Sequence, residues 1–165
     1  MSGARAPIRP PWSKGESHFT EHCSRCGECL KACPETILQP GAGGFPAVDF
    51  NIGMCTFCGD CASACPEPAL TLNGDPGRAP WKLRATPLEE ACLARKGVVC
   101  RACGEQCELG AIRFRPRPGG MADVMVDESA CNGCGACVRP CPTGAVVVRQ
   151  PAGGRHEERE ERCSA

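Results

Sequence analysis

The sequence predicts a small α+β protein built as two tandem units, each with short hairpins and short helices arranged around clustered cysteines. Three observations support this prediction. Sixteen of the seventeen cysteines fall into four groups of four, similar apolar segments flank these groups in both halves of the chain, and only 4% of the residues are aromatic. So few large side chains leave little bulk for an ordinary hydrophobic core. Groups bound by the cysteines are therefore expected to replace part of that core.

Three of the four groups share the spacing C-x2-C-x2-C-x3-C-P. They are Cys23, Cys26, Cys29 and Cys33 before Pro34; Cys55, Cys58, Cys61 and Cys65 before Pro66; and Cys131, Cys134, Cys137 and Cys141 before Pro142. This spacing is typical of bacterial ferredoxins, in which it holds [4Fe-4S] clusters. Each iron of such a cluster takes one soft thiolate ligand, which cysteine supplies. The sequence therefore predicts tandem bacterial 2[4Fe-4S] ferredoxin-like units with four [4Fe-4S] clusters.

The fourth group departs from this spacing. It consists of Cys92, Cys100, Cys103 and Cys107, with seven residues in its first gap and Glu108 in place of proline. The residues after Cys107 parallel those after Cys141, which identifies Cys107 as the last ligand of its motif. The usual first ligand would then fall at Gly97, so Cys92 has to reach the cluster over a longer loop. If it does not, this cluster lacks one iron or is absent.

The fourth cysteine of each motif is expected to bind the cluster of the neighbouring motif, as in two-cluster ferredoxins. The predicted sets are site 1, Cys23, Cys26, Cys29 and Cys65; site 2, Cys55, Cys58, Cys61 and Cys33; site 3, Cys92, Cys100, Cys103 and Cys141; and site 4, Cys131, Cys134, Cys137 and Cys107. Gly27, Gly59 and Gly135 follow the second cysteine of the regular motifs, where a missing side chain lets backbone N–H groups approach the cluster sulfurs.

Two other uses of clustered cysteines are less favoured. Zinc sites use separated CxxC pairs, whereas these motifs run through three consecutive steps. A disulfide scaffold needs an oxidising compartment, and the N-terminus has no apolar signal core. Cys163 lies in a charged C-terminal segment and is expected to be a bystander thiol. His22 adjoins Cys23, where it either tunes the site, replaces a ligand or is simply solvated, the last being the default.

The chain divides into five segments: an extended N-terminal arm at 1–20, a first ferredoxin unit at 21–74, a linker at 75–90, a second unit at 91–150 and a charged, disordered tail at 151–165. Trp12 in the arm either anchors a partner or packs back over a cluster. Short helices of one turn are expected after the third cysteines, and a short helical stretch from Leu88 to Ala94 carries Cys92. Strands are expected at Ile37–Leu38, Ala47–Phe50, Leu70–Leu72, Ile112–Phe114, Val124–Val126 and Val146–Val148.

The charges and the absent motifs exclude several function classes. The formal net charge is zero, but sixteen cysteinates around four oxidised clusters add about −8. Residues 21–74 carry two basic and six acidic side chains, whereas residues 78–117 carry nine and four, a polarity that either orients a protein partner or is accidental. Nucleic acid binding is not expected, because no basic run is interleaved with aromatics.

No stretch has the length of a membrane span, so a cytoplasmic location is expected, where cysteines stay reduced. No nucleophile–base pair, phosphate loop or flavin fingerprint is visible. The chain is therefore expected to transfer electrons, or to assist another protein, rather than to act as an enzyme.

The four-motif pattern resembles the NapF family of ferredoxin-type proteins, which belongs to the periplasmic nitrate reductase system. The resemblance rests on residues Ile8–Ser13 in the arm, Cys23–Gly27, Gly43–Pro46 and Cys55–Gly59, and it covers roughly residues 7–150. It implies a cytoplasmic four-cluster protein that acts on the molybdenum-containing catalytic subunit before export, by donating electrons or by loading its cluster. The sixteen cysteines named above would be its ligands. A permanent electron-transfer subunit of a membrane-associated oxidoreductase and an iron–sulfur store or sensor remain alternatives.

Overall fold

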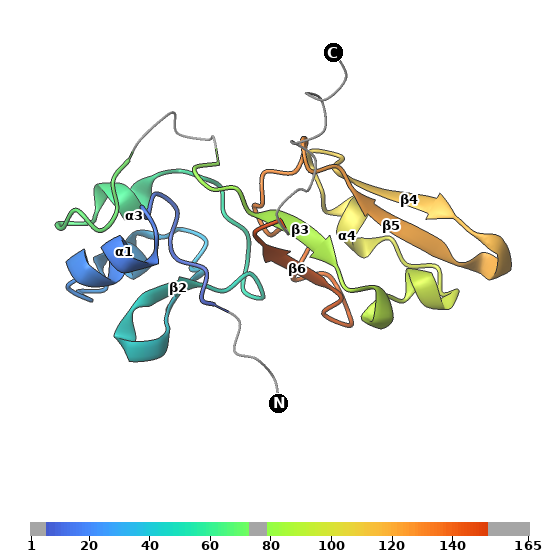
Figure 1. Cartoon of the computed structure of the whole chain (residues 1–165), viewed down its shortest axis with the longest axis horizontal. Coiled ribbons are helices and arrows are strands. Elements are labelled where there is room, and N and C mark those ends of the chain that lie inside the picture. Colours follow the sequence, from blue (N-terminus) through green and yellow to red (C-terminus); the bar gives the residue numbers. More distant parts are fainter. Residues whose placement is uncertain (1–5, 73–78, 152–165) are drawn as a thin grey trace, which may run out of the picture.

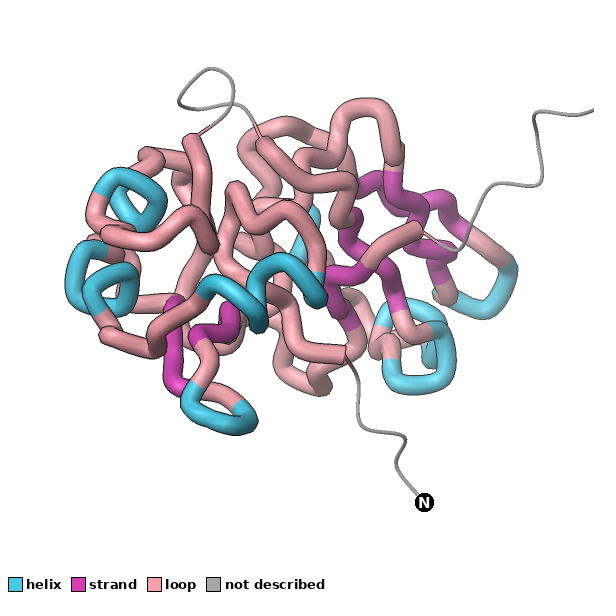
Figure 2. Tube along the Cα trace, turned by 60° about the vertical axis from the view of Figure 1, so that its left-hand side comes forward, coloured by secondary structure: helices cyan, strands magenta, loops and turns pink. Residues whose placement is uncertain are grey.

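The computed structural model describes residues 6–72 and 79–151. They form a first lobe, residues 6–72, and a second lobe, residues 79–151, which lie side by side (Figure 1). Loops make up most of both lobes, and the helices and strands are short (Figure 2). The predicted α+β class is confirmed. No helix within the described ranges has both the length and the apolar character that crossing a bilayer requires.

The first lobe contains three short helices and one hairpin. Its elements are α1 (Glu16–His22), α2 (Glu28–Ala32), β1 (Leu38–Pro40), the 3₁₀ turn η1 (Ala42–Gly44), β2 (Pro46–Val48) and α3 (Asp60–Ser63). Strands β1 and β2 pair antiparallel, with Leu38 opposite Val48. The hairpin connects the two cysteine motifs of this lobe and overlaps the strands expected at Ile37–Leu38 and Ala47–Phe50, although β1 runs on to Pro40 and β2 already ends at Val48. Its shortness leaves most backbone available to the cysteine loops.

The second lobe repeats this arrangement around a longer hairpin. Its elements are β3 (Arg84–Pro87), η2 (Glu89–Ala91), η3 (Ala94–Lys96), α4 (Ala102–Glu105), β4 (Ile112–Pro116), η4 (Pro118–Gly120), β5 (Ala122–Val126) and β6 (Val146–Arg149). Strands β4 and β5 pair antiparallel between the third and fourth motifs, with Ile112 opposite Val126. The strands expected at Ile112–Phe114, Val124–Val126 and Val146–Val148 therefore all form.

Each lobe is closed by pairing between the segment before its motifs and the segment after them. In the second lobe β3 pairs with β6, with Ala85 opposite Val148. In the first lobe the equivalent contact is a single bridge between Ser13 and Leu70, beside which the Thr71 N–H donates to the Trp12 carbonyl oxygen at 3.2 Å. Three segments thus differ from expectation: the arm is built into the first lobe and runs into α1, β3 lies within the expected linker, and the strand expected at Leu70–Leu72 is reduced to the bridge at Leu70.

The helical stretch expected from Leu88 to Ala94 does not form. It consists of two separate 3₁₀ turns, η2 and η3, and Cys92 between them has an extended backbone (φ −74°, ψ 123°). In a continuous helix the helical repeat would set the direction of the Cys92 side chain. The extended backbone between the two turns lets it point in another direction. The short helices α2, α3 and α4 also begin one residue before the third cysteine of their motifs rather than after it.

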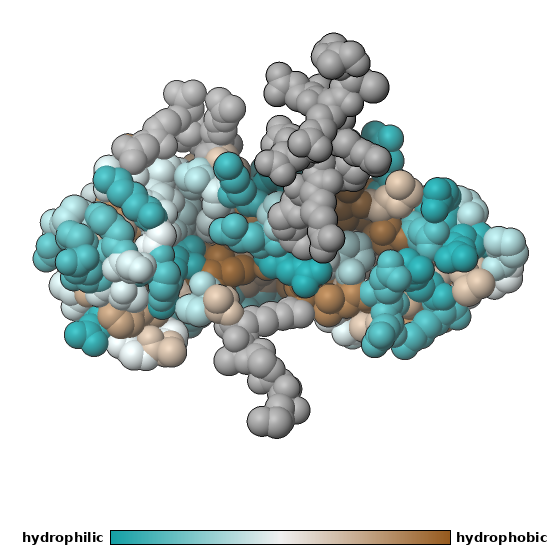
Figure 3. Space-filling view, viewed as in Figure 1, coloured by the Kyte–Doolittle hydropathy of each residue, from teal (hydrophilic) through white to brown (hydrophobic). Residues whose placement is uncertain are grey.

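The buried side chains form three groups. One lies in the first lobe around Trp12, Phe19, Phe57 and Leu70, and a second lies in the second lobe around Ile112 and Val146. The third, which we call the junction core, joins the lobes and consists of Ile37, Phe50, Leu83 and Val148. Figure 3 shows hydrophobic surface gathered between the lobes. The lobes therefore share packed apolar contacts.

Trp12 packs back into the first lobe and does not project as an anchor for a partner. Its side chain is only 6% exposed, and it lines a cavity together with Pro11 and four cysteines. Its backbone has φ +66°, a left-handed conformation that nonglycine residues adopt only when the surrounding structure fixes them. The arm therefore acts as a cover over one cysteine site.

We predict that Trp12→Ala lowers the free energy of unfolding by about 3–5 kcal/mol, because it removes a large buried aromatic side chain. Anaerobic denaturant unfolding measures this change. Val99→Ala serves as the control, because Val99 is 92% exposed and should change the stability by less than about 0.5 kcal/mol. Equal effects of the two changes would contradict the packing of Trp12.

Candidate iron–sulfur sites

Four cavities bring the sixteen cysteine side chains together in four groups, and Cys55 also lines the cavity of the last group. The groups are Cys23, Cys26, Cys29 and Cys65; Cys33, Cys55, Cys58 and Cys61; Cys92, Cys100, Cys103 and Cys141; and Cys107, Cys131, Cys134 and Cys137. Each group takes three cysteines from one motif and the fourth from the other motif of the same lobe. This is the crossed grouping expected for sites 1 to 4, and Cys92 lies with its predicted partners. That iron binds at these cysteines stays a prediction.

The chemistry of the four cavities suits a cluster of several iron atoms. All sixteen cysteines within the described residues are free thiols. The thiols surround a space instead of converging on one point, and in the same residues no three His, Cys, Asp or Glu side chains are placed to hold a single metal ion. A [4Fe-4S] cluster takes one thiolate at each iron corner, so it needs ligands spread around it. Mostly apolar side chains fill the remaining walls.

Site 4 differs from the other three in size and in its walls. Its cavity measures about 240 Å³, against about 20 Å³ for each of sites 1 to 3. Residues 54–57 of the first lobe line it beside the four cysteines of the second lobe. Site 4 therefore lies where the two lobes meet, whereas sites 1 and 3 are lined only by their own lobes.

Left-handed backbone on both sides of the second cysteine winds each regular motif around its site. Gly27, Gly59 and Gly135 follow that cysteine with φ of +78°, +88° and +83°. The residues before it are Arg25, Phe57 and Gly133, with φ of +60°, +57° and +74°. Sequence analysis singled out the glycines after the cysteine but missed the positions before it. The only available signal was Gly133, because arginine and phenylalanine rarely adopt this conformation.

The third cysteine of each motif is the most deeply placed. Burial raises the pKa of Cys29 and Cys103 to about 11, and that of Cys61 and Cys137 to about 12. These thiols hold their protons at neutral pH, so iron has to displace a proton when it binds. Cys29 and Cys61 belong to one buried group, as do Cys103 and Cys137. The two sites of each lobe thus adjoin through their buried cysteines.

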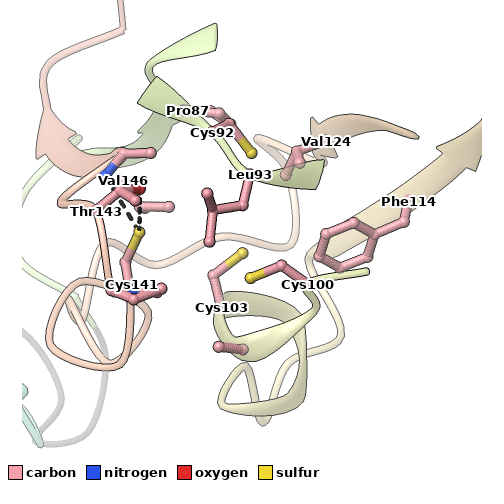
Figure 4. Close-up of a pocket in the computed structure, with 13 residues that line it drawn as sticks. Pro87, Cys92, Leu93, Cys100, Cys103, Phe114, Val124, Cys141, Thr143 and Val146 are labelled. Atoms are coloured by element: carbon pink, nitrogen blue, oxygen red, sulfur yellow. Dashed lines mark hydrogen bonds between the residues drawn. The ribbon is translucent and has the colours of Figure 1, made fainter. Parts of the chain in front are cut away.

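Hydrogen-bond donors surround Cys141, the crossing ligand predicted for site 3. The Ala145 N–H donates to its Sγ at 3.1 Å, and Thr143 Oγ1 lies 3.8 Å away (Figure 4). Burial acts to raise the pKa of Cys141, but hydrogen bonds from Thr143, Ala145 and Val146 outweigh it and hold the pKa below its ordinary value. Donors of this kind stabilise a thiolate, which is the form that binds iron.

Site 3 includes the irregular motif. Cys92 approaches the site from the turn between η2 and η3, opposite Cys100 and Cys103 (Figure 4). Gly97, at the position of the usual first ligand, instead ends η3 with φ +79°. The seven-residue gap therefore contains one 3₁₀ turn and a left-handed reversal that returns the chain to Cys100. The long loop thus places Cys92 in the cavity of site 3, where the regular spacing would have placed the first cysteine of the motif.

A group of ion pairs ties this loop to the β4–β5 hairpin. Arg95 on η3 contacts Glu89 at 2.8 Å and Asp123 on β5 at 3.3 Å. Asp123 also accepts hydrogen bonds from Arg115 and Arg117, both at 3.3 Å. Partial burial acts to raise the pKa of Asp123, but the three arginines outweigh it, so the pKa lies below its ordinary value. The carboxylate stays charged and fixes the loop.

The histidines beside the first motif do not line a cysteine cavity. His18 and His22 stack on α1 with their ring centroids 4.2 Å apart, and His22 Nδ1 lies 2.9 Å from the His18 carbonyl oxygen. His22 is absent from the walls of site 1. The imidazole thus contacts its neighbour on the helix, and four cysteines already line that site. Cys163 and His156 lie outside the described residues.

Comparison with protein families finds two matches along the chain. A 4Fe-4S dicluster domain matches residues 22–70, and a second 4Fe-4S dicluster domain matches residues 98–145. The chain therefore contains two tandem domains of this type, which agree with the two lobes. The second match begins after Cys92, the cysteine whose position departs from the regular spacing.

Similar proteins are ferredoxin-type. The chain is 48% identical to the ferredoxin-type protein NapF of Escherichia coli strain K12, with 86% of this chain and 84% of that protein covered. It is 45% identical to the ferredoxin-type protein NapF of Haemophilus influenzae, over 86% of this chain and 78% of that protein. The methylamine utilization ferredoxin-type protein MauM of Methylophilus methylotrophus is 32% identical, over 88% and 71%.

We predict that Cys92→Ser removes one cluster and that Cys163→Ser removes none. Iron and acid-labile sulfide in anaerobically purified protein should fall from about sixteen to about twelve of each per chain in the first variant and stay unchanged in the second. The change at Cys92 removes a thiol from site 3, whereas all four sites are already lined without Cys163. A loss caused by the change at Cys163 would refute the grouping at site 3.

We predict that Asp123→Asn speeds the loss of iron from site 3 to a chelator and spares the other sites, because three arginines lose their shared carboxylate. Absorbance decay with bathophenanthroline measures the rate. Because the pKa of Asp123 is lowered in the folded protein, this stabilisation is fully present above the ordinary pKa of an aspartate and is lost only as the pH falls below it toward the lowered value, so the rates are compared near neutral pH. Glu28→Gln, which breaks the exposed pair with Lys31, is the control. Equal rates in both variants would count against the role of Asp123.

Proposed function

The chain belongs to the NapF family of ferredoxin-type proteins, and we propose that its sixteen grouped cysteines hold four [4Fe-4S] clusters that carry single electrons. One observation carries this proposal: four cavities, each lined by one set of four thiols in the crossed pattern of a two-cluster ferredoxin, with Cys55 of site 2 also lining the cavity of site 4. The two dicluster domain matches support the same count. The clusters would supply one-electron redox chemistry, and the protein would set their reduction potentials through hydrogen bonding and solvent exposure.

Residues of the chain would shield the clusters from water and donate hydrogen bonds to the cysteine sulfurs. Trp12 and Phe57 belong to the buried group around sites 1 and 2, where they exclude water. Backbone N–H groups such as that of Ala145 donate to cysteine sulfur and favour the more negative, reduced state. In the second lobe the Ala85 N–H lies 3.5 Å from Cys131 Sγ. Such N–H···S hydrogen bonds would stabilise the added negative charge when a cluster gains one electron, without requiring a change of backbone conformation.

The finer proposal is an accessory role toward periplasmic nitrate reductase. In it the protein acts in the cytoplasm on the molybdenum-containing catalytic subunit before export, by donating electrons or by loading that subunit's cluster. Support comes from family membership and from the basic character of residues 78–117. Val99, almost fully exposed beside Cys100, places an apolar contact next to site 3. Trp12 does not contribute to this contact surface, because its side chain is buried.

The first test measures iron and acid-labile sulfide in anaerobically purified protein. About sixteen of each per chain are expected from four clusters. A protein with about four zinc ions and no sulfide would refute cluster binding.

The second test is copurification from cells that make the reductase. A transient complex with the unexported catalytic subunit is expected. Iron content of that subunit, measured after deletion of the gene for this protein, separates loading from electron supply. A stoichiometric complex with a quinol-oxidising membrane partner would instead favour a permanent electron-transfer subunit and overturn the accessory role.

A further inference from the structure

Two cysteines from different lobes meet directly at the junction. The Cys55 N–H donates to the carbonyl oxygen of Cys134 at 2.8 Å. Cys55 lines site 2 in the first lobe, and Cys134 lines site 4 in the second. Cys134 also packs against the buried group of the first lobe. A hydrogen bond therefore joins the backbone of one candidate ligand to that of another across the lobes.

Close packing around this hydrogen bond holds the two lobes together. Phe50 of the first lobe lies against Gly135, where any Cβ would overlap the ring. Within the second lobe, Gly133 lies against the Leu83 carbonyl and leaves no room for a Cβ. Trp81 meets Phe50 and Phe57 edge to face, with ring centroids 6.1 and 5.6 Å apart, and its Nε1–H donates to the Asn132 carbonyl oxygen at 3.2 Å.

The contacts among the sites have a single linear order. Sites 1 and 2 adjoin through the buried Cys29 and Cys61, and sites 3 and 4 adjoin through the buried Cys103 and Cys137. Between the lobes, site 4 alone is lined by residues of both, and those of the first lobe come from the loop that carries Cys55. Sites 1 and 3 are lined by their own lobes. The order along the molecule is 1, 2, 4, 3.

We infer that the two lobes exchange electrons at the Cys55–Cys134 contact, so that the protein is one continuous four-site relay with sites 1 and 3 as its two ends. Electron tunnelling falls steeply with distance, and within the described residues this contact is the one hydrogen bond that joins the two lobes. In each step site 2 loses one electron and site 4 gains it, or the reverse, with no bond made and no proton moved. The inference rests on the proposed binding of four clusters.

The two ends of the relay, sites 1 and 3, lie in lobes of different charge, so they would favour different partners. Site 3 lies in the lobe with the basic segment, beside the exposed Val99 and the ion-paired Arg95. Site 1 lies in the lobe where acidic side chains outnumber basic ones. A donor and an acceptor can therefore bind to opposite ends at the same time, each with its own charge complement.

Two glycine variants test the relay. Gly135→Ala forces a Cβ against Phe50 and opens the junction. Gly27→Ala is the matched control, because Gly27 has the same place in its motif and the same left-handed backbone, but a Cβ there meets nothing within 4 Å. Low-temperature EPR of the fully reduced protein detects magnetic interaction between clusters, and iron and sulfide are measured on every sample. Hydrogen exchange at the Cys55 amide reports whether the junction has opened.

The expected result is loss of part of the magnetic interaction in Gly135→Ala, with faster exchange at Cys55 and full iron content. Gly27→Ala places the same backbone strain at site 1, away from the junction, and should leave the exchange at Cys55 unchanged. Wild-type interaction in a loaded variant whose Cys55 amide exchanges freely would overturn the relay. If Gly135→Ala loses iron or keeps the junction closed, Phe50→Ala opens the same contact from the other lobe and is judged by the same criteria. Absence of iron and sulfide from the unchanged protein would instead refute the proposed function.

Discussion

The structure depends on burying cysteine thiols, four to a site, in mostly apolar surroundings. Burial holds the pKa of Cys61 and Cys137 near 12, so in the absence of metal these positions are protonated and bury polarisable but weakly bonded sulfur. In the proposed loaded protein, iron would convert the same positions into strong links. Each crossing cysteine would then join the two motifs of a lobe through the bound group. The hairpins, closing strands and arm arrange the loops around those links.

The sequence was most informative where spacing alone fixes geometry. The regular motifs predicted which cysteines share a cavity, because a fixed number of residues between thiols leaves few ways to wind around one site. The hairpins followed from apolar pairs such as Ile112 and Phe114. Even the irregular motif was predictable, since the residues after Cys107 repeat those after Cys141 and only one cysteine remained to complete the set.

Other features depended on contacts that spacing does not reveal. The segment before each pair of motifs looked like an arm or a linker because it is rich in proline, yet prolines at the ends of two-stranded pairs are compatible with β3 and with the Ser13–Leu70 bridge. The left-handed Arg25 and Phe57 were invisible because their residue types give no sign of that conformation. The expected helix at Cys92 failed because local propensity was overridden by the need to direct one thiol.

The closing pairs determine when each lobe is complete during synthesis. Once Leu70 and Thr71 have left the ribosome they can pair with Trp12 and Ser13, which makes the first lobe self-contained while the second is still unmade. The second lobe has to wait for β6, which comes after its last motif. One wall of its inner cavity is already in place by then, supplied by residues 54–57. The earlier lobe thus contributes part of the surface around which the inner cavity of the later lobe closes.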